Sequence, residues 1–211
     1  IFLPKYFHKR VIIALFAVVI GIIIGTIVAL IRDNHDKNGK LVVLNSLAKA
    51  YVNIIRGTPV ILQLMIIYYV IFKSVNINIV IVSILAFGIN SGAYVSEIIR
   101  AGINSISVGQ TEAGYALGFK YGEVMRLIVL PQAIKNILPA LGNEFVTLIK
   151  ETSVGAYIGV VELTKASDII ASRTYDYFFP LIIIAVIYLI LTVGLSKLMS
   201  RLERKLNNVR S

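Results

Sequence analysis

One stretch of the chain carries polar side chains at helical spacing. Asn90, Tyr94 and Glu97 occupy positions i, i+4 and i+7, so they share one face of a helix. Ser91 adjoins this set, and Arg100 follows one turn after Glu97. An amide, hydroxyls and a carboxylate on one face could bind a polar ligand. Two structural alternatives remain open: an ion pair between Glu97 and Arg100, and hydrogen bonds from Asn90 and Ser91 to another helix.

A second polar set lies further along the chain. Glu144, Thr147 and Glu151 occupy positions i, i+3 and i+7, and Thr152 and Ser153 follow directly. Carboxylates accept hydrogen bonds from ammonium groups, and hydroxyls donate them to carboxylates. The two faces could therefore line one polar cavity. Alternatively, the lysine that precedes Glu151 neutralises it, or this pair marks the outer membrane interface.

Several other kinds of chemistry are excluded by residue type and spacing. The chain has no cysteine, and His8 and His35 lie far apart without a metal-ligand pattern around them. A phosphate-binding G-x-x-x-x-G-K-[ST] motif is absent from the sequence, so this chain should not hydrolyse ATP by itself. We therefore predict no catalytic residue and no metal site, and we expect the polar sets to bind rather than to react.

The elements that position these sets are apolar enough to cross a membrane. Hydrophobic residues make up 57% of the 211 residues and charged residues only 15%. Long segments contain no charge, namely Val11–Ile31, Ser74–Ser96, Tyr177–Ser196 and the shorter Gly57–Phe72. A helix that crosses the hydrocarbon core needs roughly 20 apolar residues. The pattern predicts an all-α membrane protein with a single domain over residues 1–211, and it excludes a disordered chain.

We expect about five membrane spans. They are Val11–Ile31, about Pro59–Phe72, about Ile79–Ile98, Ile134–Ile158 with a break near Lys150–Ser153, and about Phe178–Met199. Leu41–Ile55 should form an interfacial helix before the motif at 56–59, and Val160–Tyr175 a short exposed helix and loop. Most basic residues then lie on one side if the C-terminal tail, 201–211, is cytoplasmic, which predicts the N-terminus outside and the C-terminus inside. Because the basic residues lie between apolar runs, we expect no nucleic-acid partner.

A polar loop between Arg100 and Arg126 contains a compact helix-forming segment. Thr111 could cap this helix, Glu112 would face its positive end, and Ala113 contributes a small apolar surface. Gly118 could end the helix or allow the close approach of another backbone. This segment is either an ordinary amphipathic loop helix or a helix offered to a partner protein.

The loop resembles a motif of ABC importer membrane subunits. Their pattern is E-A-A, three residues, G, nine residues, I, one residue and L-P, and this chain differs by Gly114 in place of the second alanine. Further segments resemble the polar-amino-acid branch of that family, in the same order and with similar spacing. They are Arg56-Gly57-Thr58-Pro59 with Gln63, Asn90-Ser91-Gly92-Ala93-Tyr94 with Glu97, Gly142-Asn143-Glu144, and Lys150-Glu151-Thr152-Ser153.

The resemblance implies a fold, partners and a location. It implies the type I permease core, with Glu112, Ala113, Gly114 and Gly118 in a cytoplasmic coupling helix that docks into an ATPase subunit. ATP and Mg would be bound by two copies of that ATPase and not by this chain. A second permease subunit, an identical copy in the simpler case, and an extracytoplasmic amino-acid-binding protein would complete the complex. The chain would lie in the bacterial inner membrane and would work by alternating access.

The same resemblance turns the polar sets into a predicted amino-acid site. Glu97 or Glu151 would accept from the ammonium group, and Ser91, Thr152 or Ser153 would donate to the carboxylate, with Asn90 and Tyr94 beside them. Three carboxylates, including Glu144, against one or two nearby bases favour a basic amino acid. A neutral one such as glutamine is the runner-up.

Two other classes of function remain open at this point. An ion-coupled carrier could use intramembrane carboxylates to relay protons without an ATPase, although the chain shows no internal repeat of the kind such carriers contain. A membrane scaffold without transport is the other alternative, and the polar faces argue against it.

Overall fold

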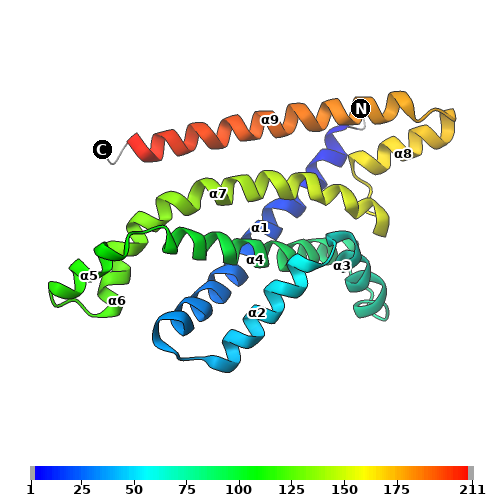
Figure 1. Ribbon diagram of the computed structural model, residues 1–211. Helices are drawn as coiled ribbons and strands as arrows, with labels where there is room; N and C mark the ends of the chain where they lie inside the picture. The colour runs from blue at the N-terminus through cyan, green and yellow to red at the C-terminus, as the bar shows by residue number, and fades with distance from the viewer. Residues whose placement is uncertain (1–2, 209–211) are drawn as a thin grey trace.

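The described part of the molecule is entirely helical. The computed structural model describes residues 3–208, and side chains are described for residues 8–204. Within these residues no strand occurs (Figure 1). The α-helices are α1 (Leu3–Asn38), α2 (Val42–Gly57), α3 (Val60–Ile66), α4 (Ile79–Asn104), α5 (Val108–Ala116), α6 (Tyr121–Val124), α7 (Leu130–Glu151), α8 (Leu163–Thr174) and α9 (Phe178–Asn208). Three short non-α segments accompany them, π-helical η1 (Ile67–Ile71) and η2 (Met125–Val129) and 3₁₀-helical η3 (Thr152–Ile158).

Within the described part of the chain, four helical segments are long and apolar enough to span a membrane. They are His8–Asn38, Ile79–Asn104, Tyr121–Ile158 and Phe178–Arg204. A fifth span requires α2 together with α3 and η1, which are joined by a bend of 109°. The all-α membrane fold with four to five spans is therefore confirmed. The single span expected at Pro59–Phe72 is wrong in detail, because α3 and η1 alone are too short to cross a bilayer.

Two other boundaries differ from expectation. α4 continues to Asn104 before the loop begins, and α9 continues through Asn208, so the basic tail extends a helix; residues 209–211 of that tail lie outside the described residues. Thr111 lies inside α5 and is not its N-cap, since the helix starts after Ser107. The expected break near Lys150–Ser153 is present, because α7 ends at Glu151 and η3 follows.

The packing of α1 against α4 depends on pairs of glycines four residues apart on both helices. A Cβ atom on Gly25 would lie 2.6 Å from Cγ1 of Val95 and 2.9 Å from the carbonyl oxygen of Gly92. A Cβ atom on Gly88 would lie 2.7 Å from Cγ2 of Ile20. Small residues at this spacing let helices approach closely inside a membrane. The glycines thus place the face of α4 that carries Gly88, Gly92 and Val95 directly against α1.

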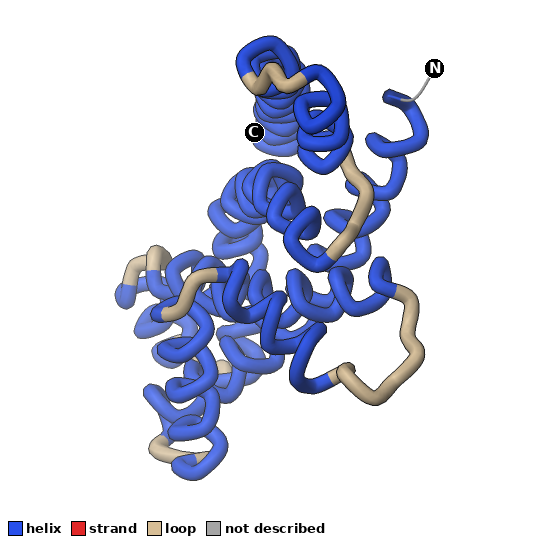
Figure 2. Tube along the Cα trace, turned by 90° about the vertical axis from the view of Figure 1, so that its right-hand side faces the viewer, coloured by secondary structure: helices blue, strands red, loops and turns tan. Residues whose placement is uncertain are grey.

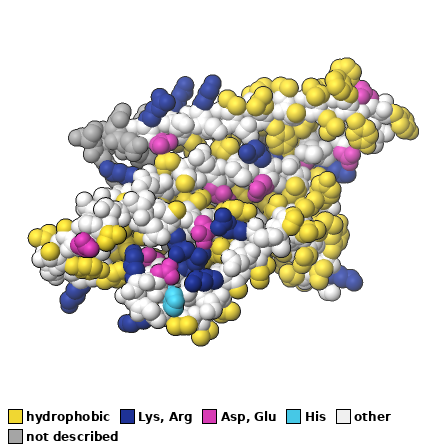
Figure 3. Space-filling model, in the orientation of Figure 1, with side chains coloured by type: hydrophobic (Ala, Val, Ile, Leu, Met, Phe, Trp, Pro, Cys, Tyr) yellow, Lys and Arg dark blue, Asp and Glu magenta, His cyan; other side chains and the backbone are white. Residues whose placement is uncertain are grey.

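The remaining helices flank this pair. α7 and α9 run alongside each other in both views (Figures 1 and 2), and α5 and α6 form one end of the molecule. The main apolar cluster joins α1, α3, α4 and α7 through buried side chains such as Ala17, Leu64, Phe87 and Leu148. Much of α9 is exposed within this single chain: hydrophobic side chains cover its first half, and basic side chains follow along its second half (Figure 3).

Candidate functional site

The bend between α2 and α3 is held by one buried glutamine. The amide nitrogen of Gln63 donates to the carbonyl oxygens of Ile55 (2.7 Å) and Thr58 (3.1 Å) and to the Thr58 hydroxyl (2.8 Å). Its amide oxygen accepts from Asn90 Nδ2 at 2.9 Å. These bonds satisfy backbone carbonyls that the bend leaves without helical partners. Asn90, a predicted binding residue, therefore also joins α4 to the bend.

A second hydrogen bond joins the two predicted polar faces. Ser91 on α4 is fully buried and donates to Glu144 Oε1 on α7 at 2.9 Å. The structure thus brings Ser91 of the α4 set and Glu144 of the α7 set into contact. It also shows that Asn90 and Ser91 make the interhelical hydrogen bonds that the sequence left as an alternative.

Glu97 lies in a charged network at the ends of α1 and α4. It forms an ion pair with Arg32, and Arg100 Nη1 lies 3.9 Å from the same carboxylate. Arg100 also bonds to Asp36 at 2.6 Å. Arg32, from a distant part of the chain, therefore pairs with the Glu97 carboxylate together with Arg100, which lies one turn after it. The charge of Glu97 is therefore already balanced by Arg32 and Arg100.

The broken end of α7 carries the other three predicted residues. Thr152 is buried and its hydroxyl donates to the carbonyl oxygen of Ile149 at 3.0 Å. Glu151 and Ser153 are half-buried, and within the described part of the chain no hydrogen bond engages either side chain. Tyr94, on α4, is partly exposed and lies against the Arg56 guanidinium, 5.4 Å from its ring centre. Glu151, Ser153 and Tyr94 are thus the predicted residues whose side chains make no hydrogen bond within the described part of the chain.

An open groove of about 530 Å³ lies between α7 and α9 beside this break. Basic and hydroxyl side chains line it, among them Lys150, Lys197, Arg201, Arg204, Ser196 and Thr192. Its lining is positive, in contrast to the acidic surplus inferred from sequence. Lys150 reaches this groove from the end of α7, whereas the neighbouring Glu151 is not among its lining residues.

The helix of the polar loop exposes one face and packs with the other. Glu112 and Ala113 are exposed, whereas Gly114 is buried and a Cβ atom there would lie 2.8 Å from Cδ1 of Ile128. The glycine that replaces the second alanine of the motif therefore permits close packing of α5 on η2. Gly118 has φ +85°, a left-handed conformation that favours glycine, and it follows the end of the helix.

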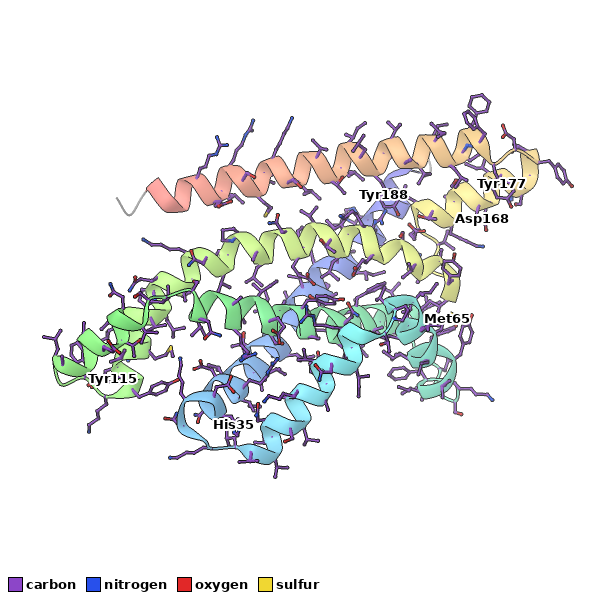
Figure 4. All side chains as sticks on the ribbon, in the orientation of Figure 1. His35, Met65, Tyr115, Asp168, Tyr177 and Tyr188 are labelled. Atoms are coloured by element: carbon purple, nitrogen blue, oxygen red, sulfur yellow. The ribbon has the colours of Figure 1, made fainter. Side chains whose placement is uncertain are left out.

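Exposed apolar side chains surround this helix. Val108, Leu117 and Tyr115 are 69%, 75% and 46% exposed, and Tyr115 lies at the end of the molecule formed by α5 and α6 (Figure 4). On the inner side, the Tyr121 hydroxyl donates to Asp33 of α1 at 2.8 Å. The loop helix α5 thus presents an exposed apolar surface, and α6, which follows it, is hydrogen-bonded to the membrane-spanning helix α1.

Sequence reasoning missed two buried ionisable residues. Arg10 and Glu162 are 0% and 1% exposed, and they lie 3.9 Å apart. The only signal was that each is a charged residue at the edge of an apolar segment, which is also where interfacial charges occur. Their pairing across most of the chain could not be read from spacing.

Comparison with known proteins agrees with this geometry. Residues 17–208 match the family described as binding-protein-dependent transport system inner membrane component. The chain is 41% identical over 192 residues to a putative glutamine transport system permease protein of Rickettsia prowazekii (strain Madrid E), covering 90% of this chain and 86% of that protein. It is 40% identical over 192 residues to an arginine transport system permease protein of Bacillus subtilis (strain 168), covering 90% and 85%. A solved structure titled as an amino acid ABC transporter with histidines superposes with a TM-score of 0.88 at 41% identity, covering 96% of this chain and 92% of that chain.

Proposed function

Because the chain belongs to the family of binding-protein-dependent transport system inner membrane components, we propose that it forms one half of the path by which an ATP-driven importer carries a polar amino acid across the membrane by alternating access. The chain is a permease subunit of an ABC importer and not an enzyme, and ATP is hydrolysed by a separate ATPase. Two ATPase copies, a second copy of this chain, an extracytoplasmic binding protein, and an orientation with the N-terminus outside belong to the proposal.

The observation that carries the proposal is the exposed helix α5. Glu112, Ala113 and Gly118 lie on its accessible side or just past its end, and exposed apolar side chains flank them. Val108, Tyr115 and Leu117 are exposed together at this end of the molecule, and within the described residues none of them belongs to a buried apolar cluster. An exposed apolar patch of this kind is typical of a surface that binds another protein. An ATPase groove of complementary shape fits both the position and the family.

The coupling role is tested at Gly118. We expect Gly118→Asp to place a charge against the ATPase and to lower uptake at least tenfold, while the subunit still inserts. Gly118→Ala is the matched control, because alanine tolerates the left-handed conformation no better than aspartate and no atom of this chain lies within 4 Å of the added Cβ. Uptake and ATPase copurification would be measured for both. Equal effects of the two substitutions would assign the loss to backbone strain and contradict docking.

The amino acid is proposed to be basic, with a neutral polar one as runner-up. The Glu97 charge is balanced by two arginines, and Glu144 accepts from Ser91. Glu151 is then the carboxylate left to meet a cationic group, and the basic α7–α9 groove can meet the substrate carboxylate. Two relatives are named for glutamine and for arginine transport, which is consistent with either choice.

Substrate charge is tested on the purified permease–ATPase complex without binding protein. We expect arginine, lysine or histidine to bind more tightly than glutamate, and Glu151→Gln to weaken their binding by about tenfold, the size of one charge-assisted hydrogen bond. Lys165→Gln serves as a control at an exposed charge on α8. Tighter binding of glutamate than of any basic amino acid, or an unchanged affinity in Glu151→Gln, would refute the basic-substrate proposal.

A further inference from the structure

The C-terminal carbonyls of α7 are capped by Arg10, a side chain of α1. An α-helix leaves its last carbonyl oxygens without backbone partners. Arg10 of α1 donates from Nε to the carbonyl oxygen of Ile149 at 2.7 Å and from Nη2 to that of Lys150 at 3.3 Å. The same Nε lies 3.2 Å from the Thr152 hydroxyl. One guanidinium therefore contacts Ile149, Lys150 and Thr152, the residues that surround the break next to Glu151 and Ser153 in the sequence.

The Arg10 guanidinium is buried, so its charge depends on neighbouring side chains for compensation. Arg10 is 0% exposed, and Nη1 lies 3.9 Å from Glu162 Oε2, which is equally inaccessible. The guanidinium carbon lies 3.9 Å from the centre of the Tyr188 ring, a cation–π arrangement on α9. Tyr188 lies where α9 passes the N-terminal part of α1 (Figure 4). Such a charge is stable inside a membrane protein only while its partners stay in place.

The partners of Arg10 are themselves fixed. Glu162 uses Oε1 to accept from the Lys165 backbone nitrogen at 2.9 Å, which caps the start of α8. Tyr188 donates its hydroxyl proton to Glu162 Oε2 at 3.3 Å and is 2.9 Å from the Thr164 hydroxyl. α1, α7, α8 and α9 thus meet at one ion pair, with α8 and α9 determining where the guanidinium sits.

We propose that Arg10 is a positioning residue that holds the broken end of α7 in the conformation that binds the transported amino acid, and that Glu162 and Tyr188 set the position of Arg10. The inference rests on the proposed function. Arginine suits this role because its planar group can address two successive carbonyls at once, whereas a lysine ammonium is a single compact charge. Displacing the guanidinium displaces the turn that carries Glu151, Thr152 and Ser153.

The test uses the assembled permease–ATPase complex and separates affinity from turnover. Arg10→Lys keeps the positive charge near Glu162 but cannot donate to the carbonyls of Ile149 and Lys150 at the same time, as the planar guanidinium does. We expect the amino-acid concentration for half-maximal ATPase stimulation to rise at least tenfold, while the maximal stimulated rate changes less than threefold. A merely structural role would instead lower the yield of complex and the maximal rate, with the half-maximal concentration unchanged.

A matched control and a milder variant complete the design. Lys165→Gln combined with Asp168→Asn removes an exposed ion pair of α8 with a 2.7 Å bond, in which the carboxylate raises the pKa of the lysine; wild-type values are expected. Tyr188→Phe keeps the ring beside Arg10 and removes only the hydroxyl bonded to Glu162. We expect the half-maximal amino-acid concentration of this variant to rise about threefold. This variant still tests the proposal if the Arg10→Lys complex does not assemble.

The outcomes separate the two proposals. Half-maximal concentrations equal to wild type in Tyr188→Phe, or in an assembled Arg10→Lys complex, would overturn the positioning role. A wild-type complex whose ATPase responds to no amino acid would instead refute the proposed function.

Discussion

At the scale of single residues, buried amides and charged side chains form hydrogen bonds and ion pairs between helices. Gln63 shows this most clearly, because one side chain satisfies two backbone carbonyls at the bend and accepts from Asn90. Such groups contribute little net stability when paired but are costly when a partner is removed inside a low-dielectric region. The polar residues of this molecule therefore serve both architecture and the site.

Gln63→Leu tests this at the bend. The substitution keeps approximate volume but leaves the carbonyls of Ile55 and Thr58 and the Asn90 amide without their partner, at a cost of about 2–4 kcal/mol. We expect a clear fall in the thermal midpoint of the purified complex. Gln132→Leu is the control, since the Gln132 side chain is half-buried and donates only to the carbonyl of Ile128, one turn earlier in the adjoining segment η2. Equal midpoints for the two variants would contradict the role of Gln63.

The sequence predicted which residues are polar inside the membrane but not which partners they have. Glu97 and Arg100 were recognisable as a pair because they lie one turn apart, whereas Arg32 reaches the same carboxylate from α1. The Arg10–Glu162 pair could not be predicted either, because the two residues lie on different elements and far apart in the sequence. Helical periodicity reports which side chains share a face of one helix, and it carries no information about the helix opposite.

At the scale of elements, apolar length predicted the long helices well and the broken ones less well. The spans around α1, α4 and α9 follow from uninterrupted apolar runs. The 109° bend and the π-helical turns η1 and η2 depend on local backbone bonds that hydropathy does not record. The break after Glu151 was predictable because charged and hydroxyl residues interrupt an apolar run there.

The contact between α1 and α4 gives an element-scale prediction. Gly25→Ala adds a methyl group against Val95 and the Gly92 carbonyl, and overpacking of this kind costs about 1–3 kcal/mol. We expect the thermal midpoint to fall by about 2–6 °C. In Gly194→Ala on α9, where nothing lies within 4 Å of the added Cβ, better helix propensity should leave the midpoint equal or higher. A stabilised Gly25→Ala variant would contradict the close approach.

At the scale of the whole molecule, the four to five spans of the described residues are too few to enclose a transport path by themselves. Exposed apolar side chains along α9, such as Ile182, Leu189 and Ile190, must be covered by lipid or by another subunit. A pair of permease subunits around a two-fold axis is the simplest arrangement that encloses a path.

Energy coupling and stoichiometry are tested together in proteoliposomes. We expect uptake to require ATP, to persist when ionophores dissipate ion gradients, and to come from a complex whose mass contains two permease chains. A functional complex with one copy and no second permease would contradict the pairing. Uptake driven by an ion gradient without ATP would instead favour the ion-coupled carrier.

The Arg10–Glu162 pair also bears on how the chain is made. Ribosomes synthesise α1 before α8, and at about 5–20 residues per second roughly 10–30 s pass between the addition of Arg10 and that of Glu162. During that interval a nascent α1 carries an arginine without its carboxylate, and an uncompensated charge enters lipid unfavourably. We therefore expect the stable integration of α1 into the membrane to be completed only after Glu162 has been added. Ribosome-stalled fragments ending before Glu162 should remain at the insertion machinery and be degraded faster than fragments that include it.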